Sequence, residues 1–138
     1  MKLDPPSNIY LSDSQLADAG RGVFARQGIS KGELIESCPI IFLSKKDYPL
    51  AKKTELLNYY FLNKPEDRAA IALGYGSIYN HSYEPNATYK KRLEKGFIDF
   101  VAIENIKADE EITVNYNYGN PKDKKKLWID EIPAHKEK

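Results

Sequence analysis

The stretch that decides the fold lies at residues 74–86 and reads GYGSIYNHSYEPN. Its centre is an Asn-His pair, Asn80 and His81, and a Pro-Asn pair, Pro85 and Asn86, follows four residues later. The flanks of this polar segment are apolar or aromatic. Because polar groups are concentrated here within an otherwise ordinary globular sequence, the segment is the first candidate for a functional site.

His81 has few partners in the sequence for metal or nucleophilic chemistry. The only other histidine is His135, close to the end of the chain, and the only cysteine is Cys38. A zinc site needs about four such ligands, so metal binding is excluded on ligand number. A catalytic pair of Cys38 and His81 is conceivable, although no orienting group or oxyanion site is evident near either residue.

A glycine-rich turn stands far upstream of this segment. Residues 19–25 read AGRGVFA, in which Gly20 and Gly22 flank Arg21. Glycine tolerates a positive φ and lets the backbone approach a ligand closely. The pattern lacks the third glycine and the following helix of a dinucleotide fingerprint, so on its own it predicts a tight turn between strands.

A third segment stands downstream, at residues 106–119, and reads IKADEEITVNYNYG. An acidic turn leads into a predicted strand over 111–116, and Tyr116 and Tyr118 follow each other at a spacing of two. In a regular strand these two side chains would share one face.

Short elements with frequent glycine and proline predict a mainly β domain with one short helical insert. Expected strands lie at 8–11, 22–26, 33–38, 39–43, 87–89, 97–103 and 111–116, with a bend at Pro39 and a helix over 54–62. The segments around 86–92 and 96–103 predict a hairpin.

Composition limits the functional class. The chain has 138 residues, of which 41% are hydrophobic and 30% charged, as in one soluble globular domain. Lys and Arg number 21 against 20 Asp and Glu, which argues against a nucleic-acid binder. A single cysteine excludes intramolecular disulfides. The sequence shows no transmembrane stretch or signal peptide, so we expect a cytoplasmic protein, with a nuclear or host-nuclear location left open.

Together and in this order, the three segments resemble the motifs of the SET-domain protein lysine methyltransferases. The matching residues are Gly20-Arg21-Gly22, then residues 80–86 (NHSYEPN), then residues 110–116 (EEITVNY). The resemblance implies the SET fold, in which small curved sheets surround a knot-like threading of the third segment beneath a loop. It implies a SET domain over 1–119 with a variable insert at about 44–73, and a closing segment over 120–138.

The resemblance also implies the site. S-adenosylmethionine is the cofactor, and Tyr116 matches the catalytic tyrosine. The cofactor-binding positions are Ala19, Gly20, Arg21, Asn80, His81, Tyr116 and Trp128. The lysine channel is lined by Tyr89, Val114 and Tyr118. No metal is implied. Cys38 falls in a region where some family members place a channel tyrosine.

The implied partner is a protein that presents a lysine, with no membrane and no nucleic acid involved. The family's zinc-binding flanks are missing, so residues 120–138, with Trp128 among them, are expected to close the channel. A catalytically silent module that binds a lysine-bearing peptide is the alternative, but the chain keeps Asn80, His81 and Tyr116. A homodimer is left open.

Overall fold

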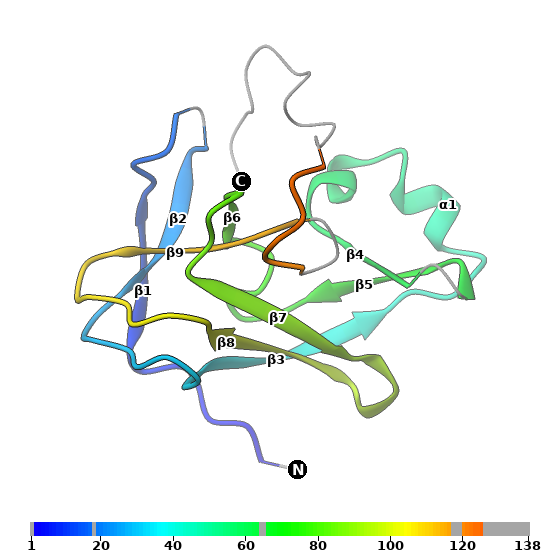
Figure 1. The fold of residues 1–138 in the computed structure, drawn as a ribbon. Coiled ribbons are helices and arrows are strands. Elements are labelled where there is room, and N and C mark those ends of the chain that lie inside the picture. Colours follow the sequence, from blue (N-terminus) through cyan, green and yellow to red (C-terminus); the bar gives the residue numbers. More distant parts are fainter. Residues whose placement is uncertain (1, 18, 64–65, 117–119, 126–138) are drawn as a thin grey trace.

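The computed structural model describes residues 2–17, 19–63, 66–116 and 120–125, and within them the chain forms two sheets (Figure 1). The first sheet has the order β1-β2-β9-β6, and the second has the order β4-β5-β3-β8-β7. Their bounds are β1 Ile9–Asp13, β2 Arg21–Ala25, β3 Leu34–Phe42, β4 Phe61–Asn63, β5 Arg68–Ala72, β6 Asn80–His81, β7 Ala87–Arg92, β8 Phe97–Ala102 and β9 Glu111–Val114. The helical elements are short: α1 Tyr48–Ala51, η1 Glu55–Asn58 and η3 Leu93–Lys95. The mainly β prediction is confirmed.

The predicted hairpin is confirmed as β7 and β8, which pair antiparallel from Ala87↔Ala102 to Arg92↔Phe97. Gly96 closes the turn with a φ of 89°, a conformation that glycine adopts without steric cost. Along β8 the side chains of Ile98 and Phe100 are fully buried. This alternation turns one face of the hairpin toward the core.

The bend expected at Pro39 is instead a change of partner within one continuous strand. β3 pairs with β8 as far as Pro39↔Phe97, and with β5 from Ile40↔Ala72 onward. The irregularity in the register lies earlier, between Leu34 and Glu36. Proline has no N–H, so it cannot donate a hydrogen bond to a neighbouring strand. At Pro39 this missing bond is tolerated, because β3 leaves β8 there and pairs with β5 from the next residue.

The helix expected over 54–62 is wrong. Only η1 is helical there, begun by Thr54, whose Oγ1 accepts a hydrogen bond from the Leu56 N–H at 3.1 Å. Phe61 belongs to β4 and pairs with Ala70. The Phe61 ring meets Tyr89 edge-on at 4.9 Å between centroids. Packing of that partly buried ring on Tyr89, within the second sheet, overrides the local helical periodicity.

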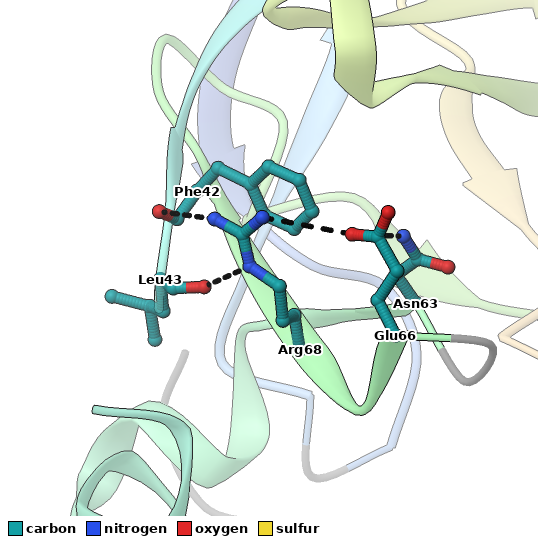
Figure 2. A network of polar contacts seen from close by, with 5 residues as sticks. All are labelled: Phe42, Leu43, Asn63, Glu66 and Arg68. Carbon is teal, nitrogen blue, oxygen red and sulfur yellow. Dashed lines mark hydrogen bonds and ion pairs between the residues drawn. The ribbon is translucent and has the colours of Figure 1, made fainter. Parts of the chain in front are cut away.

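Arg68 fastens the β4–β5 hairpin to the end of β3 (Figure 2). Its Nε donates to the Leu43 carbonyl at 2.8 Å, and its guanidinium carbon lies 3.5 Å from the centroid of the Phe42 ring. A 3.6 Å ion pair with Glu66 completes the network. The partners lie at the end of β3 and in the turn between β4 and β5, so Arg68 positions the part of the insert that joins the sheet.

The core lies between the two sheets and is built from side chains of both. Its members are Ile9, Val23, Ala25, Ile29, Ile35, Cys38, Ala72, Tyr79, Ala87, Tyr89, Ile98, Phe100, Ala102, Ile106, Ile112 and Val114. No helix in the described part of the chain is both long and apolar enough to span a membrane.

Candidate active site

The third sequence segment runs alongside the second at a feature that we call the crossing, residues 80–86 with 111–116. β9 lies between β2, to which it is antiparallel, and β6, to which it is parallel. The pairs are Asn80↔Thr113 and His81↔Val114, and the Ser82 N–H donates to the Val114 carbonyl at 2.9 Å. This pairing brings together residues that are more than thirty positions apart in the sequence.

Asn80 links all three sequence segments. Its side chain is only 2% exposed, and its Nδ2 donates to the Arg21 carbonyl at 2.9 Å and to Glu111 Oε2 at 2.8 Å. A buried amide is stable only when its donors find acceptors. Asn80 therefore fixes the Gly-x-Gly turn of the first segment against the strand of the third.

The two glycines of the first segment are needed for different reasons. Gly20 has a φ of 75°, which favours glycine, and its carbonyl accepts a 2.7 Å hydrogen bond from the Ser14 N–H. At Gly22 the limit is space: a Cβ there would lie 2.4 Å from Glu111 Oε2. The turn expected from the sequence is present, and it is shaped to receive the Glu111 carboxylate.

Glu111 is a site residue that the sequence did not single out. Its Oε1 accepts hydrogen bonds from the Ser14 hydroxyl at 2.8 Å and from the Gln15 N–H at 3.2 Å. Together with the contact from Asn80, these donors fully engage the carboxylate. Its position at the start of β9, inside the third segment, was the only sequence signal that could have revealed it.

Asn86 was also missed, although it closes the Asn-His segment. Its Oδ1 accepts from the Thr113 N–H at 2.9 Å, and its Nδ2 donates to the Glu111 carbonyl at 2.9 Å. One side chain thus makes two backbone hydrogen bonds to β9, as a neighbouring strand would. An asparagine is required because its amide offers both an acceptor and a donor.

Tyr116 follows β9 and is held from two sides. Its N–H donates to His81 Nδ1 at 3.0 Å, and its hydroxyl donates to the Tyr79 carbonyl at 2.6 Å. Because Nδ1 accepts, a neutral His81 ring carries its proton on Nε2. The rings of His81 and Tyr116 lie 5.2 Å apart, and Tyr83 meets His81 edge-on at 4.4 Å. Tyr116 therefore has a fixed backbone and a fixed hydroxyl.

The candidate channel residues are only partly described. Tyr89 is buried on β7, where its ring contacts Phe61 and Phe100, and Val114 is 1% exposed in the core. Tyr118 and Trp128 lie outside the described residues. The channel roles of Tyr89, Val114 and Tyr118 stay predictions, as does the cofactor contact of Trp128.

The Cys38 thiol is in the wrong environment for a nucleophile. It is fully buried, close to the backbone of Gly76, where a Cβ would lie 2.8 Å from the sulfur. Burial, and then the neighbouring Glu36 carboxylate, hold the pKa of the thiol far above its ordinary value. A thiolate is the reactive form, so these surroundings disfavour the Cys38–His81 alternative.

The described part of the closing segment, residues 120–125, returns to the crossing. The buried amide of Asn115 donates to the Asp123 carbonyl at 2.6 Å, and Lys124 Nζ donates to the Tyr83 carbonyl at 2.6 Å. These contacts hold the segment beside Asn115 and Tyr83, next to Tyr116. Closure of the channel by residues 120–138 stays a prediction.

The oxygen acceptors and aromatic rings at the crossing suit a positively charged ligand. The crossing presents a phenol oxygen, main-chain carbonyls and the rings of His81, Tyr83 and Tyr116. Arg21, exposed at the start of β2, offers a guanidinium for a carboxylate. Among the described residues there is no group of three or more His, Cys, Asp or Glu side chains that could hold a metal ion.

Comparison with known proteins gives concordant matches. The SET domain family matches residues 20–117. A Schizosaccharomyces pombe protein named histone-lysine N-methyltransferase, H3 lysine-37 specific, is 35% identical over 97 residues, covering 70% of this chain and 66% of that protein. The variant-silencing SET domain-containing protein of Plasmodium falciparum is 34% identical over 112 residues, covering 72% of this chain and 4% of that protein. This chain therefore spans just under two thirds of the first relative and a small part of the second.

Solved structures agree with these matches. A crystal structure of a candidate histone methyltransferase of Plasmodium falciparum superposes with a TM-score of 0.66 at 32% identity, covering 84% of this chain and 96% of that one. A Polycomb repressive complex 2 of Chaetomium thermophilum bound to S-adenosylmethionine gives a TM-score of 0.67 at 23% identity, over 84% of this chain and 16% of that one. The latter likeness establishes the fold alone.

Proposed function

This chain belongs to the SET-domain family, and from that premise we propose that it is a protein-lysine methyltransferase that uses S-adenosylmethionine. The observation that carries the proposal is the arrangement of Tyr116. Its hydroxyl donates to the Tyr79 carbonyl at 2.6 Å, which fixes the direction of the O–H and gives the phenol oxygen the role of a neutral acceptor. Methyl transfer to an amine needs such a fixed, neutral acceptor close to the reacting atoms.

The crossing fits the cofactor in chemistry. When bound, S-adenosylmethionine supplies a methyl group on a positively charged sulfur. The neutral lysine amine would attack the methyl carbon in line, and the sulfur would leave as a neutral thioether. Arg21 would hold the carboxylate of its amino-acid part, and the Ala19–Gly20 backbone and His81 would border the rest. Trp128 is proposed to lie against the adenine ring. The fit rests on carbonyl and phenol oxygens and on aromatic rings, which favour a cation.

The substrate lysine has to be neutral to attack, and an unperturbed lysine has a pKa of about 10.4. A site lined by aromatic rings disfavours the ammonium form by desolvation. The Tyr116 oxygen can accept a hydrogen bond from the amine and so aim its lone pair. Positioning of this kind can contribute on the order of 7–11 kcal/mol to lowering a barrier.

We propose a histone tail as the substrate class, on the strength of relatives named as histone methyltransferases. A nuclear or chromatin location would follow from that substrate and replaces the cytoplasmic expectation as the favoured one. Tyr89, Val114 and Tyr118 remain the proposed walls of the lysine channel. The silent binding module is disfavoured, because the chain keeps Tyr116, the residue assigned to the reaction, and holds its hydroxyl against the Tyr79 carbonyl.

The test is transfer of a radiolabelled methyl group from S-adenosylmethionine to histone octamers and to lysine-bearing tail peptides. Tyr116→Phe should lower kcat by about 100-fold or more, because it removes a group aimed at the reacting centre. Calorimetry should show nearly unchanged cofactor affinity. A Tyr116→Phe variant as active as the wild type would contradict the assignment, and a wild-type protein that transfers no methyl would contradict the function.

A further inference from the structure

Glu36, on β3, is a buried carboxylate that the proposed mechanism does not use. It is 5% exposed, and none of the ion pairs between described residues involves it. Its partners are neutral donors: the Tyr79 hydroxyl on Oε1 at 2.8 Å and the Tyr75 N–H on Oε2 at 3.0 Å. A buried acid held in this way is costly to desolvate, and apolar side chains of similar volume often serve stability as well.

The turn that precedes the Asn-His pair is built around this carboxylate. Gly74 has a φ of 64°, and a Cβ there would lie 2.3 Å from Glu36 Oε2. The backbone therefore approaches the carboxylate as closely as glycine allows. Gly74 is thus explained by Glu36, and Gly76 by Cys38 two residues further along β3, although nothing in the sequence connects two segments so far apart.

Tyr79 connects Glu36 to the catalytic tyrosine. Its ring stacks on Phe100 at 4.2 Å between centroids and 17° between planes, and its hydroxyl is held by Glu36. Its carbonyl is the acceptor for the Tyr116 hydroxyl at 2.6 Å. Burial raises the pKa of the Tyr79 hydroxyl well above its ordinary value, so Tyr79 remains a donor to Glu36 throughout the neutral range.

We propose that Glu36 is a positioning residue for Tyr116, and that it acts through the side chain and the carbonyl of Tyr79. Glu36 fixes the Tyr79 hydroxyl, Phe100 fixes the ring, and the carbonyl at the other end of the same residue sets the direction of the Tyr116 O–H. The inference rests on the methyl-transfer function proposed above. It adds a residue that lies outside the three sequence segments at 19–25, 74–86 and 106–119.

The decisive variants are Glu36→Leu, Glu36→Gln and Tyr79→Phe. Leucine removes both acceptors, so kcat should fall by about 10- to 100-fold, the loss typical of a small misplacement, while both KM values stay within about threefold. Glutamine restores activity to within about threefold of the wild type, because its carbonyl can accept from Tyr75 and its amide can bond the Tyr79 oxygen. Tyr79→Phe keeps the stacking ring and should lower kcat by about tenfold.

Ile106→Val is the matched control, because Ile106 is a core residue outside the contacts that join Glu36, Tyr79 and Tyr116. This variant measures how much activity is lost when only the stability of the core is reduced. Circular dichroism gives the folded fraction of each variant. The combined Glu36→Leu, Tyr79→Phe variant should be no slower than Glu36→Leu. The inference is overturned if folded Glu36→Leu or Tyr79→Phe has the wild-type kcat. It is also overturned if the loss of activity is no larger than the loss of folded protein. If Glu36→Leu does not fold, Tyr79→Phe decides.

A second readout does not depend on activity. In protein labelled with ¹³C at the tyrosine Cζ, the Tyr116 resonance is assigned as the one missing in Tyr116→Phe. It should shift in Glu36→Leu and Tyr79→Phe and stay in place in Ile106→Val. A Tyr116 signal that is the same in all of them overturns the positioning role, even where the wild type transfers no methyl and the proposed function itself has failed.

Discussion

The crossing and the insert at residues 44–73 differ in how their side chains are used: buried polar side chains hold the crossing, whereas α1 and η1 of the insert expose large apolar ones. In the crossing, buried amides such as Asn80 and Asn86 bond to backbone that is distant in the sequence. In the insert, α1 and η1 leave large apolar side chains in solvent, with Leu50 60% exposed. A side chain that satisfies buried backbone groups cannot be exchanged without leaving them unpaired, whereas an exposed one can. The crossing should therefore be intolerant of substitution, and the exposed positions of the insert, such as Leu50, should be tolerant.

Asn86→Ala should show the largest effect on stability. It leaves the Thr113 N–H and the Glu111 carbonyl without their side-chain partner, which should lower the free energy of unfolding by about 2–5 kcal/mol. Asn63→Ala is the matched control, because its only described side-chain bond is a 3.4 Å exposed contact with Glu66. Urea denaturation of both variants measures the contrast. Equal losses would show that the crossing is not the more demanding region.

Gly22→Ala tests the packing of the crossing without removing a polar group. The new methyl would collide with Glu111 Oε2, so we expect a loss of about 1–3 kcal/mol in unfolding free energy and weaker cofactor binding. Gly28→Ala introduces the same methyl 3.7 Å from the nearest atom, the Ile106 carbonyl. That control should be close to neutral. A Gly22→Ala protein with wild-type stability and cofactor affinity contradicts the close fit described here.

Truncation after Gly119 tests whether residues 120–138 contribute to activity at the crossing. It removes the Asp123 carbonyl from Asn115 and the Lys124 ammonium from the Tyr83 carbonyl. The core should stay folded with a loss of about 1 kcal/mol, while KM for cofactor or peptide rises and activity falls. Circular dichroism and steady-state kinetics separate the two effects. A truncated protein that methylates as well as the full chain would exclude the segment from the site.

The smallest expected effect on the free energy of unfolding concerns Tyr60, in the insert, and appears only at high pH. Burial, with a hydrogen bond to Tyr48, raises the pKa of Tyr60 to about 12. The unfolded chain therefore loses this proton at lower pH than the folded one, so the stability that Tyr60 contributes is present below about pH 10 and is lost as pH rises toward 12. Unfolding free energy measured against pH should decline less steeply in Tyr60→Phe. An unchanged slope would contradict the shift.

Local chemistry made much of the fold predictable. The β7–β8 hairpin followed from alternating apolar residues around a glycine turn, and the mainly β class followed from the density of short elements. The helix over 54–62 failed because its spacing was shared by a 3-10 turn and by β4, and only the Phe61 contact with Tyr89 decides between them. The strand expected to reach Tyr116 ends at Val114, since Tyr116 turns its N–H to His81.

The sequence by itself determined which residues carry polar chemistry: Asn80, His81 and Tyr116 stand in patterns that few folds other than this one require. The tertiary structure alone decided what holds them. Glu36, Tyr79 and Glu111 act through contacts that span 31 to 43 positions along the chain. Periodicity and propensity describe only neighbours within a few residues, so no local pattern could indicate that a carboxylate on β3 fixes the residue whose carbonyl holds Tyr116.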